Sequence, residues 1–362
     1  MKIGFFTDSY FPQVNGVTFT LEAWKKKLEE IGHEVYIYYP SGDYTPKSNE
    51  FAFPSFEFRF YQGYRLAIPW GIVKKSKNLD IVHQHGLYTM AVGGLLSSRE
   101  NKTPRLLTFH TPGDEYINYL PLAKYLKKTY TKSYLLWERW LLKKYGKITT
   151  ASPVIMERLK ENKITDIEIL SNGVDLEMFH EAYSADFRKQ HKIKSEKVIG
   201  FCGRLGFEKH VEDLINAADE FDGHILIAGD GPARKHYEKL AHGKKNVKIL
   251  GFVKRDELKK FYSAIDVFVF PSFCETQGLV ALEAMACGTP VVAVPVAALK
   301  TTVDDGVTGY HYQPADTKDL LSKVNLCYTN MKRLKRGCLK EAGKNSVDNS
   351  VKRLVEIYSE LD

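Results

Sequence analysis

The sequence has 362 residues, of which 44% are apolar and 12% aromatic. This is enough for two domains with a hydrophobic core each, and it excludes a disordered chain. A formal net charge of +8 fits a phosphate-bearing ligand, an anionic membrane surface or nucleic acid. The five cysteines lack zinc-site or disulfide-framework spacing, so we expect a reducing compartment and no structural metal.

The apolar runs of the sequence predict no membrane insertion. Met1 and Lys2 lead directly into a strand-like segment, so we expect no signal peptide. No apolar run approaches the roughly 20 residues of a bilayer-spanning helix. We therefore expect a cytoplasmic protein that contacts a membrane, if at all, from its surface.

The first half of the sequence alternates strand-like and helix-like segments, which predicts a parallel sheet covered by helices. The expected strands cover 2–7, 34–39, 80–83, 105–109 and 147–151, and the expected helices cover 20–31, 87–98 and 152–162. The carboxyl ends of parallel strands meet at one edge of a sheet, where α/β proteins bind ligands.

Two residues of this half are candidates for that edge. Gly16 lies in the loop 8–17 between the first strand and the first helix, where a glycine lets the backbone approach a phosphate or a sugar. His110 directly follows the strand 105–109. The loop is not a GxGxxG, which argues against a dinucleotide-dependent oxidoreductase. His83 and His85 form an HxH pair that could bind a metal or have a structural role at a strand end.

Two segments interrupt the α/β pattern. The segment 51–71 is aromatic, fits no long helix and contains Arg59 and Arg65. The segment 119–145 has apolar residues at helical spacing and a basic remainder. We expect Arg59 and Arg65 of the first segment to contact a membrane or an acceptor. We expect the same of the following residues of the second segment: Lys124, Lys127, Lys128, Lys132 and Trp137. A core-facing apolar stripe with an ordinary solvated lysine face explains the same pattern, and the sequence leaves both interpretations open.

A polar, irregular stretch at 177–197 separates this half from a second α/β series that starts at Val198. We therefore expect an N-terminal domain over 1–177 and a C-terminal domain over 178–345. The last segment, 346–362, is an amphipathic helix that we expect to pack back on the first domain.

The second half contains two cations and two acids in loops and helix starts. Arg204 and Lys209 bracket a glycine-bearing loop before a helix, an arrangement that suits a diphosphate. Glu275 and Glu283 follow the apolar strand 265–270, the first in a loop and the second in a helix that we expect over 278–288. Two solvated acids in an ordinary βαβ unit remain the alternative. These groups together describe a sugar-nucleotide site.

Several motifs occur in an order that resembles the retaining glycosyltransferases of family 4. They are TFHTP, SNGVD, GRLGFEK, AGDGP, LGFV and E(x7)EAMACGTPVVA, in that order along nearly the whole chain. The resemblance implies the GT-B fold, an α/β architecture of two Rossmann-like α/β/α domains that face each other across a cleft.

The resemblance also implies roles for individual residues. Arg204 and Lys209 would bind the donor diphosphate and stabilise the leaving group, and Glu283 would hold the ribose hydroxyls. Glu275 would face the donor hexose, and His110 would bond it near the 6-hydroxyl. The remaining donor contacts would be Gly16, the backbone amides of Thr276, Gln277, Gly278 and Leu279, and, for the base, Phe252, Val253 and Lys254.

The sequence departs from the family pattern at two places. His210 stands where the family often has glycine, and Asn15 precedes Gly16 where many members have two glycines. The aromatic segment 51–71 and the stretch HTPGDEYINYLP are similar to those of diacylglycerol glucosyltransferases, which dock on anionic lipid through a basic amphipathic helix.

The sequence-based expectation is therefore a retaining hexosyltransferase that uses a nucleotide sugar such as UDP-glucose and a lipid acceptor such as diacylglycerol. We expect a front-face mechanism without metal or other cofactor, peripheral binding to the inner face of the cell membrane, and no nucleic-acid partner. The alternatives are a transferase that uses GDP-mannose or another donor on a soluble, polysaccharide or glycoprotein acceptor, and a nucleotide-sugar-binding protein without transfer activity. Sugar identity and oligomeric state are not readable from the sequence.

Overall fold

The computed structural model describes residues 1–57, 64–110, 113–114, 124–194 and 196–361. The chain forms two compact units, one of residues Met1–Asn172 with Val347–Asp362 and one of residues Gly173–Ser346. The sequence had placed these boundaries at 177/178 and 345/346. No helix in the described ranges is long and apolar enough to cross a membrane.

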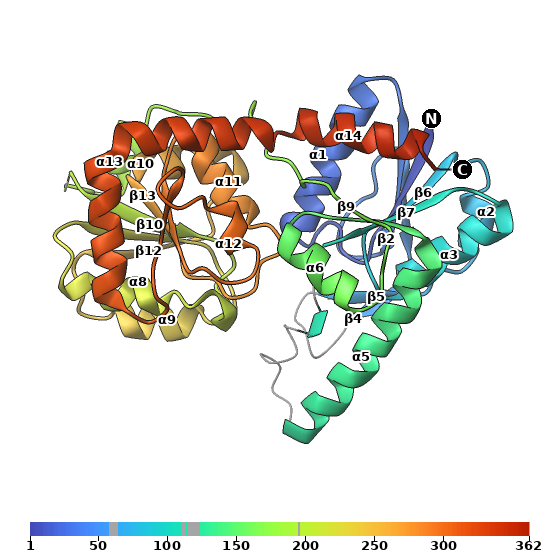
Figure 1. Ribbon diagram of the computed structural model, residues 1–362, viewed down its shortest axis with the longest axis horizontal. Helices are drawn as coiled ribbons and strands as arrows, with labels where there is room; N and C mark the ends of the chain where they lie inside the picture. Colours follow the sequence, from blue (N-terminus) through green and yellow to red (C-terminus); the bar gives the residue numbers. More distant parts are fainter. Residues whose placement is uncertain (58–63, 111–112, 115–123, 195, 362) are drawn as a thin grey trace. The chain divides into compact units, whose positions relative to one another are not determined.

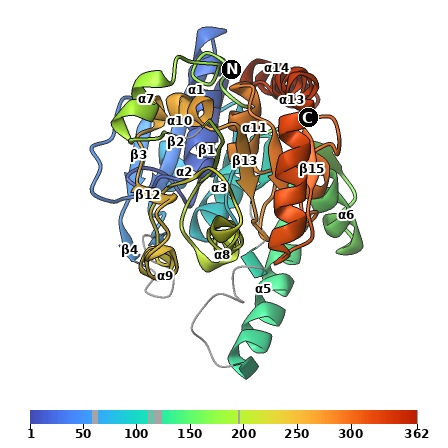
Figure 2. The same ribbon diagram turned by 90° about the vertical axis from the view of Figure 1, so that its left-hand side faces the viewer.

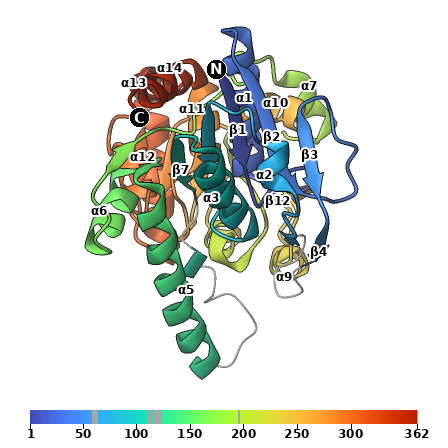
Figure 3. The same ribbon diagram turned by 90° about the vertical axis from the view of Figure 1, so that its right-hand side faces the viewer.

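The first unit contains a sheet whose described strands are all parallel and follow the order β3-β2-β1-β6-β7-β8-β9. The strands are β1 (Lys2–Phe6), β2 (Glu34–Pro40), β3 (Glu50–Phe53), β6 (Ile81–Gln84), β7 (Arg105–Phe109), β8 (Lys147–Thr150) and β9 (Ile167–Ile169). The helices are α1 (Gly16–Glu30), α2 (Ile72–Lys75), α3 (Thr89–Asn101), α5 (Lys124–Tyr145), α6 (Pro153–Glu161) and α14 (Val347–Ser359), shown in Figures 1 and 3.

Alternating side chains of β1 build the two faces of this sheet. Phe5 joins a cluster with Trp24 of α1 and Leu354 of α14, whereas Phe6 joins a cluster on the opposite face with Ile72 of α2. Adjacent residues of a strand point to opposite faces, so both faces of β1 are buried. The final helix α14 packs against α1 in this unit.

The aromatic segment 51–71 does not form a helix in its described part. It contributes β3 and an antiparallel hairpin of β4 (Ser55–Glu57) and β5 (Arg65–Ala67), with Phe56 opposite Leu66. Residues 58–63, and therefore Arg59, lie outside the described residues.

The second unit contains a parallel sheet with the order β12-β11-β10-β13-β14-β15 in the described residues. The strands are β10 (Val198–Cys202), β11 (His224–Ala228), β12 (Val247–Gly251), β13 (Val267–Phe270), β14 (Val291–Ala293) and β15 (Gly309–His311). The helices are α7 (Ala185–Gln190), η1 (Phe207–Lys209), α8 (Glu212–Asn216), η2 (Ala217–Asp219), α9 (Arg234–Ala241), η3 (Arg255–Glu257), α10 (Leu258–Ala264), α11 (Leu279–Ala286), α12 (Leu299–Thr302) and α13 (Thr317–Lys344) (Figure 2).

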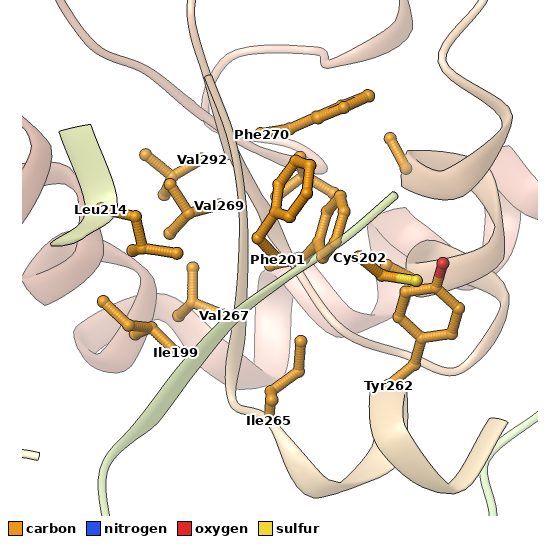
Figure 4. Packing of buried hydrophobic residues seen from close by; sticks show 14 of the residues in the cluster. Ile199, Phe201, Cys202, Leu214, Tyr262, Ile265, Val267, Val269, Phe270 and Val292 are labelled. Carbon is orange, nitrogen blue, oxygen red and sulfur yellow. The ribbon is translucent and has the colours of Figure 1, made fainter. Parts of the chain in front are cut away.

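The central strands of this sheet are buried on both faces. All four residues of β13 are buried, and Val267 and Val269 lie in one packed cluster with Ile199 and Phe201 of β10 (Figure 4). Continuous apolar strands of this kind are typical of parallel sheets covered by helices. The apolar run at 265–270 in the sequence therefore forms the middle of the core.

Residues 317–344 form one long helix, α13. Its buried positions Leu320, Val324, Cys327, Leu334 and Cys338 continue one helical stripe through Met331 without a break. The side chain of Asp316 caps the start by accepting a hydrogen bond from the Asp319 amide at 2.9 Å.

Both sheets reverse their strand order once, between β1 and β6 in the first unit and between β10 and β13 in the second. The loops that follow the two strands at such a reversal diverge to opposite faces and leave room for a ligand at the carboxyl edge. Gly16 follows β1, Lys209 follows β10 and Glu275 follows β13, whereas His110 follows the neighbouring strand β7.

Candidate active site

The loops after β10 and β11 pack directly against each other. The Leu205 amide donates to the Asp230 carbonyl at 2.9 Å, and the Ala233 amide donates to the Leu205 carbonyl at 2.8 Å. Gly229 has φ +139°, and a Cβ atom there would lie 1.8 Å from the Gly203 carbonyl oxygen. The GRLGFEK and AGDGP motifs therefore encode one locked loop pair, because a side chain at Gly229 would separate the two backbones.

Lys209 and Glu275 meet at the point where the strand order of the second sheet reverses. Lys209 ends η1 after β10, Glu275 follows β13, and the Lys209 Nζ lies 2.5 Å from the Glu275 Oε1 and 3.3 Å from the Ser272 Oγ. Burial alone would lower the pKa of Lys209, but the charge and hydrogen bond of Glu275 raise it above its usual value. Lys209 is therefore a cation at neutral pH.

Arg204 lies in the same loop pair and is exposed. Its Nη1 is 3.9 Å from the Oε1 of Glu208, whose side chain is buried beneath Gly206. The structure thus keeps the two predicted diphosphate cations in one short loop, with Arg204 exposed and Lys209 partly buried. His210, directly after Lys209, has φ +45° and therefore adopts the left-handed conformation that favours glycine. This explains why a glycine suits the position.

The segment between β13 and α11 holds the expected backbone contacts to the donor. Gln277 and Gly278 are buried, Thr276 and Leu279 are partly buried, and Gly278 has φ +79° directly before the helix. The Thr302 hydroxyl donates to the Gln277 carbonyl at 2.5 Å. The segment is therefore held from α12 while its amides stay at the carboxyl edge of β13.

Glu283 is buried inside α11, with 2% of its surface exposed. The Arg255 Nη1 donates to its Oε1 at 3.1 Å, and the Tyr262 hydroxyl donates to its Oε2 at 2.9 Å. Burial raises the pKa of Glu283, and the bonds from Arg255 and Tyr262 oppose that rise. The predicted ribose anchor is therefore already fixed by two side chains.

Sequence reasoning missed Arg255 and Tyr262. Arg255 comes shortly after β12, in the stretch that begins with the expected base contacts Phe252, Val253 and Lys254. Phe252 and Lys254 are exposed, and Val253 is partly buried. A cation just beyond the carboxyl end of a strand was the available signal for Arg255, whereas nothing in its local sequence marks Tyr262.

In the first unit, Gly16 is the first residue of α1 and is exposed. The Asn15 side chain caps the helix by accepting a hydrogen bond from the Thr18 amide at 3.1 Å. A Cβ atom at Gly16 would meet no described atom within 4 Å. Asn15 stands where many family members have glycine, and its side chain explains the difference, because asparagine is a better helix cap than glycine.

Asp8 is a further residue that the sequence did not single out. It follows β1, is buried, and accepts hydrogen bonds from the Tyr88 and Met90 amides at 2.8 Å each, which caps α3. Burial raises its pKa to about 6, although these two bonds act in the opposite direction. An acid directly after the first strand was its sequence signal.

His110 follows β7 as expected, and it lies next to His85. The His110 Nε2 and the His85 Nδ1 are 3.1 Å apart, and both rings are buried. Burial lowers the pKa of His110 to about 4, with an opposing contribution from a hydrogen bond to Asn172. His83 bonds Tyr358 and Thr108 at 2.7 Å each, so its role is structural.

No three histidine, cysteine or acidic side chains in the described ranges are grouped closely enough to bind a metal ion. Metal-independent activity stays a prediction, because it concerns the reaction and not only the side chains that could bind a metal.

The expected membrane residues occupy different surroundings. Arg65 donates through Nε to the Ser55 Oγ at 2.8 Å within the hairpin, and Trp137 donates through Nε1 to the Leu87 carbonyl at 2.7 Å. Trp137 therefore faces the body of the first unit. Lys128 and Lys132 are exposed and Lys127 is partly buried, whereas the side chain of Lys124 lies outside the described residues.

Two family models match the chain. The model "Glycosyltransferase Family 4" matches residues 14–178, and the model "Glycosyl transferases group 1" matches residues 184–345. Alpha-monoglucosyldiacylglycerol synthases are similar to the chain at 28% identity in Streptococcus pneumoniae, over 86% of this chain and 75% of the relative, and at 29% in Acholeplasma laidlawii, over 86% and 85%.

Other similar proteins carry other names. A GDP-mannose-dependent alpha-mannosyltransferase from Corynebacterium glutamicum is 24% identical over 89% of this chain and 79% of its own. The structure of HepE from Anabaena in complex with UDP-glucose superposes with a TM-score of 0.80 at 18% identity, covering all of both chains. The family matches extend over both units, and the chain therefore belongs to glycosyltransferase family 4, is a glycosyltransferase and has the GT-B fold.

Proposed function

We propose that the protein transfers a hexose, with UDP-glucose as the first donor to test, to a lipid such as diacylglycerol at the inner face of the cell membrane, with retention of configuration. The observation that carries the transfer reaction is the Lys209–Glu275 pair, 2.5 Å apart at the strand-order reversal of the second sheet. It supplies a cation for a diphosphate and an acid for sugar hydroxyls in one place.

The mechanism that we propose is a front-face departure. The bond between the anomeric carbon and the donor phosphate oxygen breaks, the acceptor hydroxyl oxygen bonds that carbon on the same face, and its proton passes to the phosphate oxygen. Lys209 and Arg204 stabilise the negative charge that develops on the diphosphate. Glu275 is assigned to the sugar hydroxyls rather than to nucleophilic attack, and Glu283 to the ribose.

Gly16 and His110 of the first unit remain donor contacts in this proposal on the strength of the family resemblance. No metal takes part, since the two cations supply the charge that a divalent ion would otherwise provide. We expect full activity in EDTA. Loss of activity in chelator with recovery in magnesium or manganese would contradict this part of the proposal.

The exposed residues of α5 support the proposal that the reaction takes place at a membrane. Tyr125, Leu136 and Trp140 are spaced by eleven and four residues, which places them on one helix face, and 61% of Leu136 and 46% of Trp140 are exposed. Lys128 and Lys132 are exposed as well. Apolar and aromatic residues among lysines suit an anionic bilayer surface.

The opposite side of α5 corresponds to the core-facing alternative. Tyr134, Leu141 and Tyr145 are buried against the first unit. The apolar stripe that the sequence showed is therefore core in its second half, and the proposed membrane face is a different one. In Figure 3 the helix, in green, extends below the rest of the unit.

The β4–β5 hairpin adds a second exposed apolar surface in the same unit. Trp70 is 87% exposed, and Phe56 and Ile68 are about half exposed, whereas Ala67 between them is buried. Lys74 on α2 is exposed nearby in the sequence. Isolated exposed apolar residues are ordinary, but a group of them on one hairpin and the loop that follows it favours a membrane contact.

Vesicle co-sedimentation tests the membrane part. At low salt we expect the wild-type protein to bind vesicles containing anionic phospholipid and not neutral ones, and the double variant L136E/W140E to bind at least about tenfold more weakly. The matched control is L339E, which places an acid at an exposed leucine of α13 in the second unit. Equal binding by all three proteins would contradict the assignment of α5.

The second candidate is a transferase with another donor and a soluble acceptor, and the similarity to a GDP-mannose-dependent enzyme is the observation that favours it. Incubation with a panel of UDP- and GDP-sugars identifies the donor through transfer or hydrolysis. A donor that binds without transfer or hydrolysis under any acceptor condition would favour the nucleotide-sugar-binding alternative.

A further inference from the structure

We propose that His85 is a positioning residue for His110: its hydrogen bond selects one tautomer and one ring orientation of His110. The tautomer follows from geometry within the first unit. Its consequence for catalysis rests on the proposed function, in which His110 contacts the donor sugar.

The sheet brings the two histidines together. β6 and β7 are paired in parallel with His83 opposite Leu106, and residues two apart in a strand share a face. His83 and His85 therefore lie on one face with Thr108 and His110 of the neighbouring strand. Trp24 of α1 covers this face, with ring centroids 5.8 Å from His85 and 6.5 Å from His110.

The polar contacts form two separate rows. In the first, His83 uses both ring nitrogens, one toward Tyr358 and one toward Thr108, whose hydroxyl is 2.7 Å from that of Thr149. In the second, His85 and His110 face each other through Nδ1 and Nε2 at 3.1 Å. Within the described residues, the His85 Nε2 is buried without a hydrogen-bond partner.

Two neutral imidazoles that face each other share a single proton between the facing nitrogens. Burial lowers the pKa of His85 well below its usual value and that of His110 to about 4, so both rings are neutral at pH 7. If His85 carries its proton on Nδ1, His110 must accept at Nε2 and carry its own proton on Nδ1. If His85 accepts instead, His110 carries its proton on Nε2.

The buried Nε2 of His85 selects between these states, because it has no hydrogen-bond partner within the described residues. A buried N–H without an acceptor is the more costly state, so Nε2 is a lone pair and His85 carries its proton on Nδ1. His85 then donates from Nδ1 to the His110 Nε2, 3.1 Å away, and His110 carries its own proton on Nδ1.

The consequence is that His110 is held as a neutral ring with its N–H on Nδ1 and its Nε2 bonded to His85. Without the His85 bond, the ring would lose its anchor at Nε2 and both tautomers would become accessible. A binding group whose orientation is fixed by a neighbour needs no reorganisation when the ligand arrives.

Nitrogen-15 NMR of the histidine rings tests the tautomer directly, without any substrate. Protonated and bare ring nitrogens give well-separated signals, and H110Q identifies the His110 signals by their loss. In the wild-type protein we expect His110 to be protonated on Nδ1. In H85Q, whose amide replaces Nε2 but not Nδ1, we expect a mixture of tautomers. In H85N, whose amide lies where Nδ1 was, we expect the wild-type pattern.

Kinetics and binding then separate positioning from a folding defect. We expect H85Q to lower kcat/KM for the nucleotide sugar by about tenfold or more, H85N to retain activity within about threefold, and both to bind free UDP like the wild type, because UDP lacks the sugar assigned to His110. H180Q, at an exposed histidine of the second unit, is the control. Parallel loss of UDP affinity in H85Q would indicate a structural defect and overturn the positioning role.

The NMR result also separates this inference from the proposed function. Unchanged His110 signals in H85Q would overturn the inference even if the enzyme transfers sugar as proposed. The expected tautomer change in a protein that transfers no sugar to any acceptor would leave the His85–His110 arrangement intact and refute the proposed function.

Discussion

The Glu275 carboxylate holds the Lys209 side chain in place. The ammonium is mostly buried, hydrogen-bonded to Glu275 and near Ser272, and the carboxylate stabilises its positive charge. The ammonium has three N–H donors, so in the proposed mechanism it binds the donor diphosphate beside this carboxylate, and Glu275 contacts the sugar hydroxyls. Charge that is already in place where the transition state becomes negative lowers the barrier more than it tightens ground-state binding.

Replacement of Lys209 by alanine therefore has an asymmetric effect. We expect K209A to lower kcat by roughly 100- to 1,000-fold, the size of effect seen when one preorganised charge is removed, while donor affinity changes less than about tenfold. Steady-state kinetics together with calorimetric donor binding measure the two quantities. K239A, at an exposed lysine of α9, is the control, and equal losses in turnover and affinity would count against the role.

At the level of elements, the site depends on two loops that hold each other. The loop after β10 carries both cations. The glycine-rich loop after β11 binds it through hydrogen bonds to the amide and the carbonyl of Leu205. The close approach at Gly229 leaves no room for a side chain. The cations are therefore positioned by backbone rather than by side-chain packing.

A methyl group at Gly229 disrupts this loop pair. We expect G229A to lower the free energy of unfolding by about 3 kcal/mol or more, because the added Cβ strikes a carbonyl oxygen and the backbone is left-handed. G243A is the matched control. Gly243 also has positive φ, but a Cβ atom there would meet no described atom within 4 Å. We expect G243A to lower the free energy of unfolding by about 1 kcal/mol. Similar urea-unfolding curves for the two variants would refute the packing argument.

The buried histidines between β6, β7 and α1 make the first unit sensitive to acid. Burial lowers the pKa of His83, His85 and His110 in the fold, so the unfolded chain binds protons that the folded chain does not. Above about pH 7 these histidines do not reduce the free energy of unfolding, because they are neutral in both states. The free energy of unfolding falls as the pH drops below 6.5, the histidine pKa in the unfolded chain, toward 4, the pKa of His110 in the fold.

The expected size of this loss follows from proton linkage. Between pH 7.5 and 5.5 each of these histidines should lower the free energy of unfolding by about 1.4 kcal/mol. Asp8 opposes part of the loss, because its pKa of about 6 in the fold makes the folded chain bind a proton in this range. Urea unfolding at the two pH values measures the slope, which should shrink in H110N and stay unchanged in H180Q. The same slope in H110N and the wild type would contradict the assignment.

At the scale of the whole molecule, the sequence predicted the class of fold because parallel strands are buried on both faces and appear as continuous apolar runs. The run 265–270 became β13, and the loops that follow such runs contain Lys209 and Glu275. The family motifs then identified a glycosyltransferase.

The sequence could not predict contacts between residues far apart in the chain. The fixing of Glu283 by Arg255 and Tyr262, and the pairing of His85 with His110, depend on which strands are neighbours. The membrane face of α5 was assigned to Trp137 because periodicity finds an apolar stripe but not which side meets the core. The structure buries the second half of that stripe and exposes Trp140.

Transfer of radiolabelled glucose from UDP-glucose to diacylglycerol, in vesicles that contain anionic phospholipid, tests donor, acceptor and membrane together. We predict a labelled, chloroform-soluble glycolipid with an α-linkage, formed by the wild-type protein and formed at a small fraction of that rate by K209A. Formation of labelled product only on a water-soluble acceptor, with none in the lipid phase at any anionic lipid content, would contradict the account.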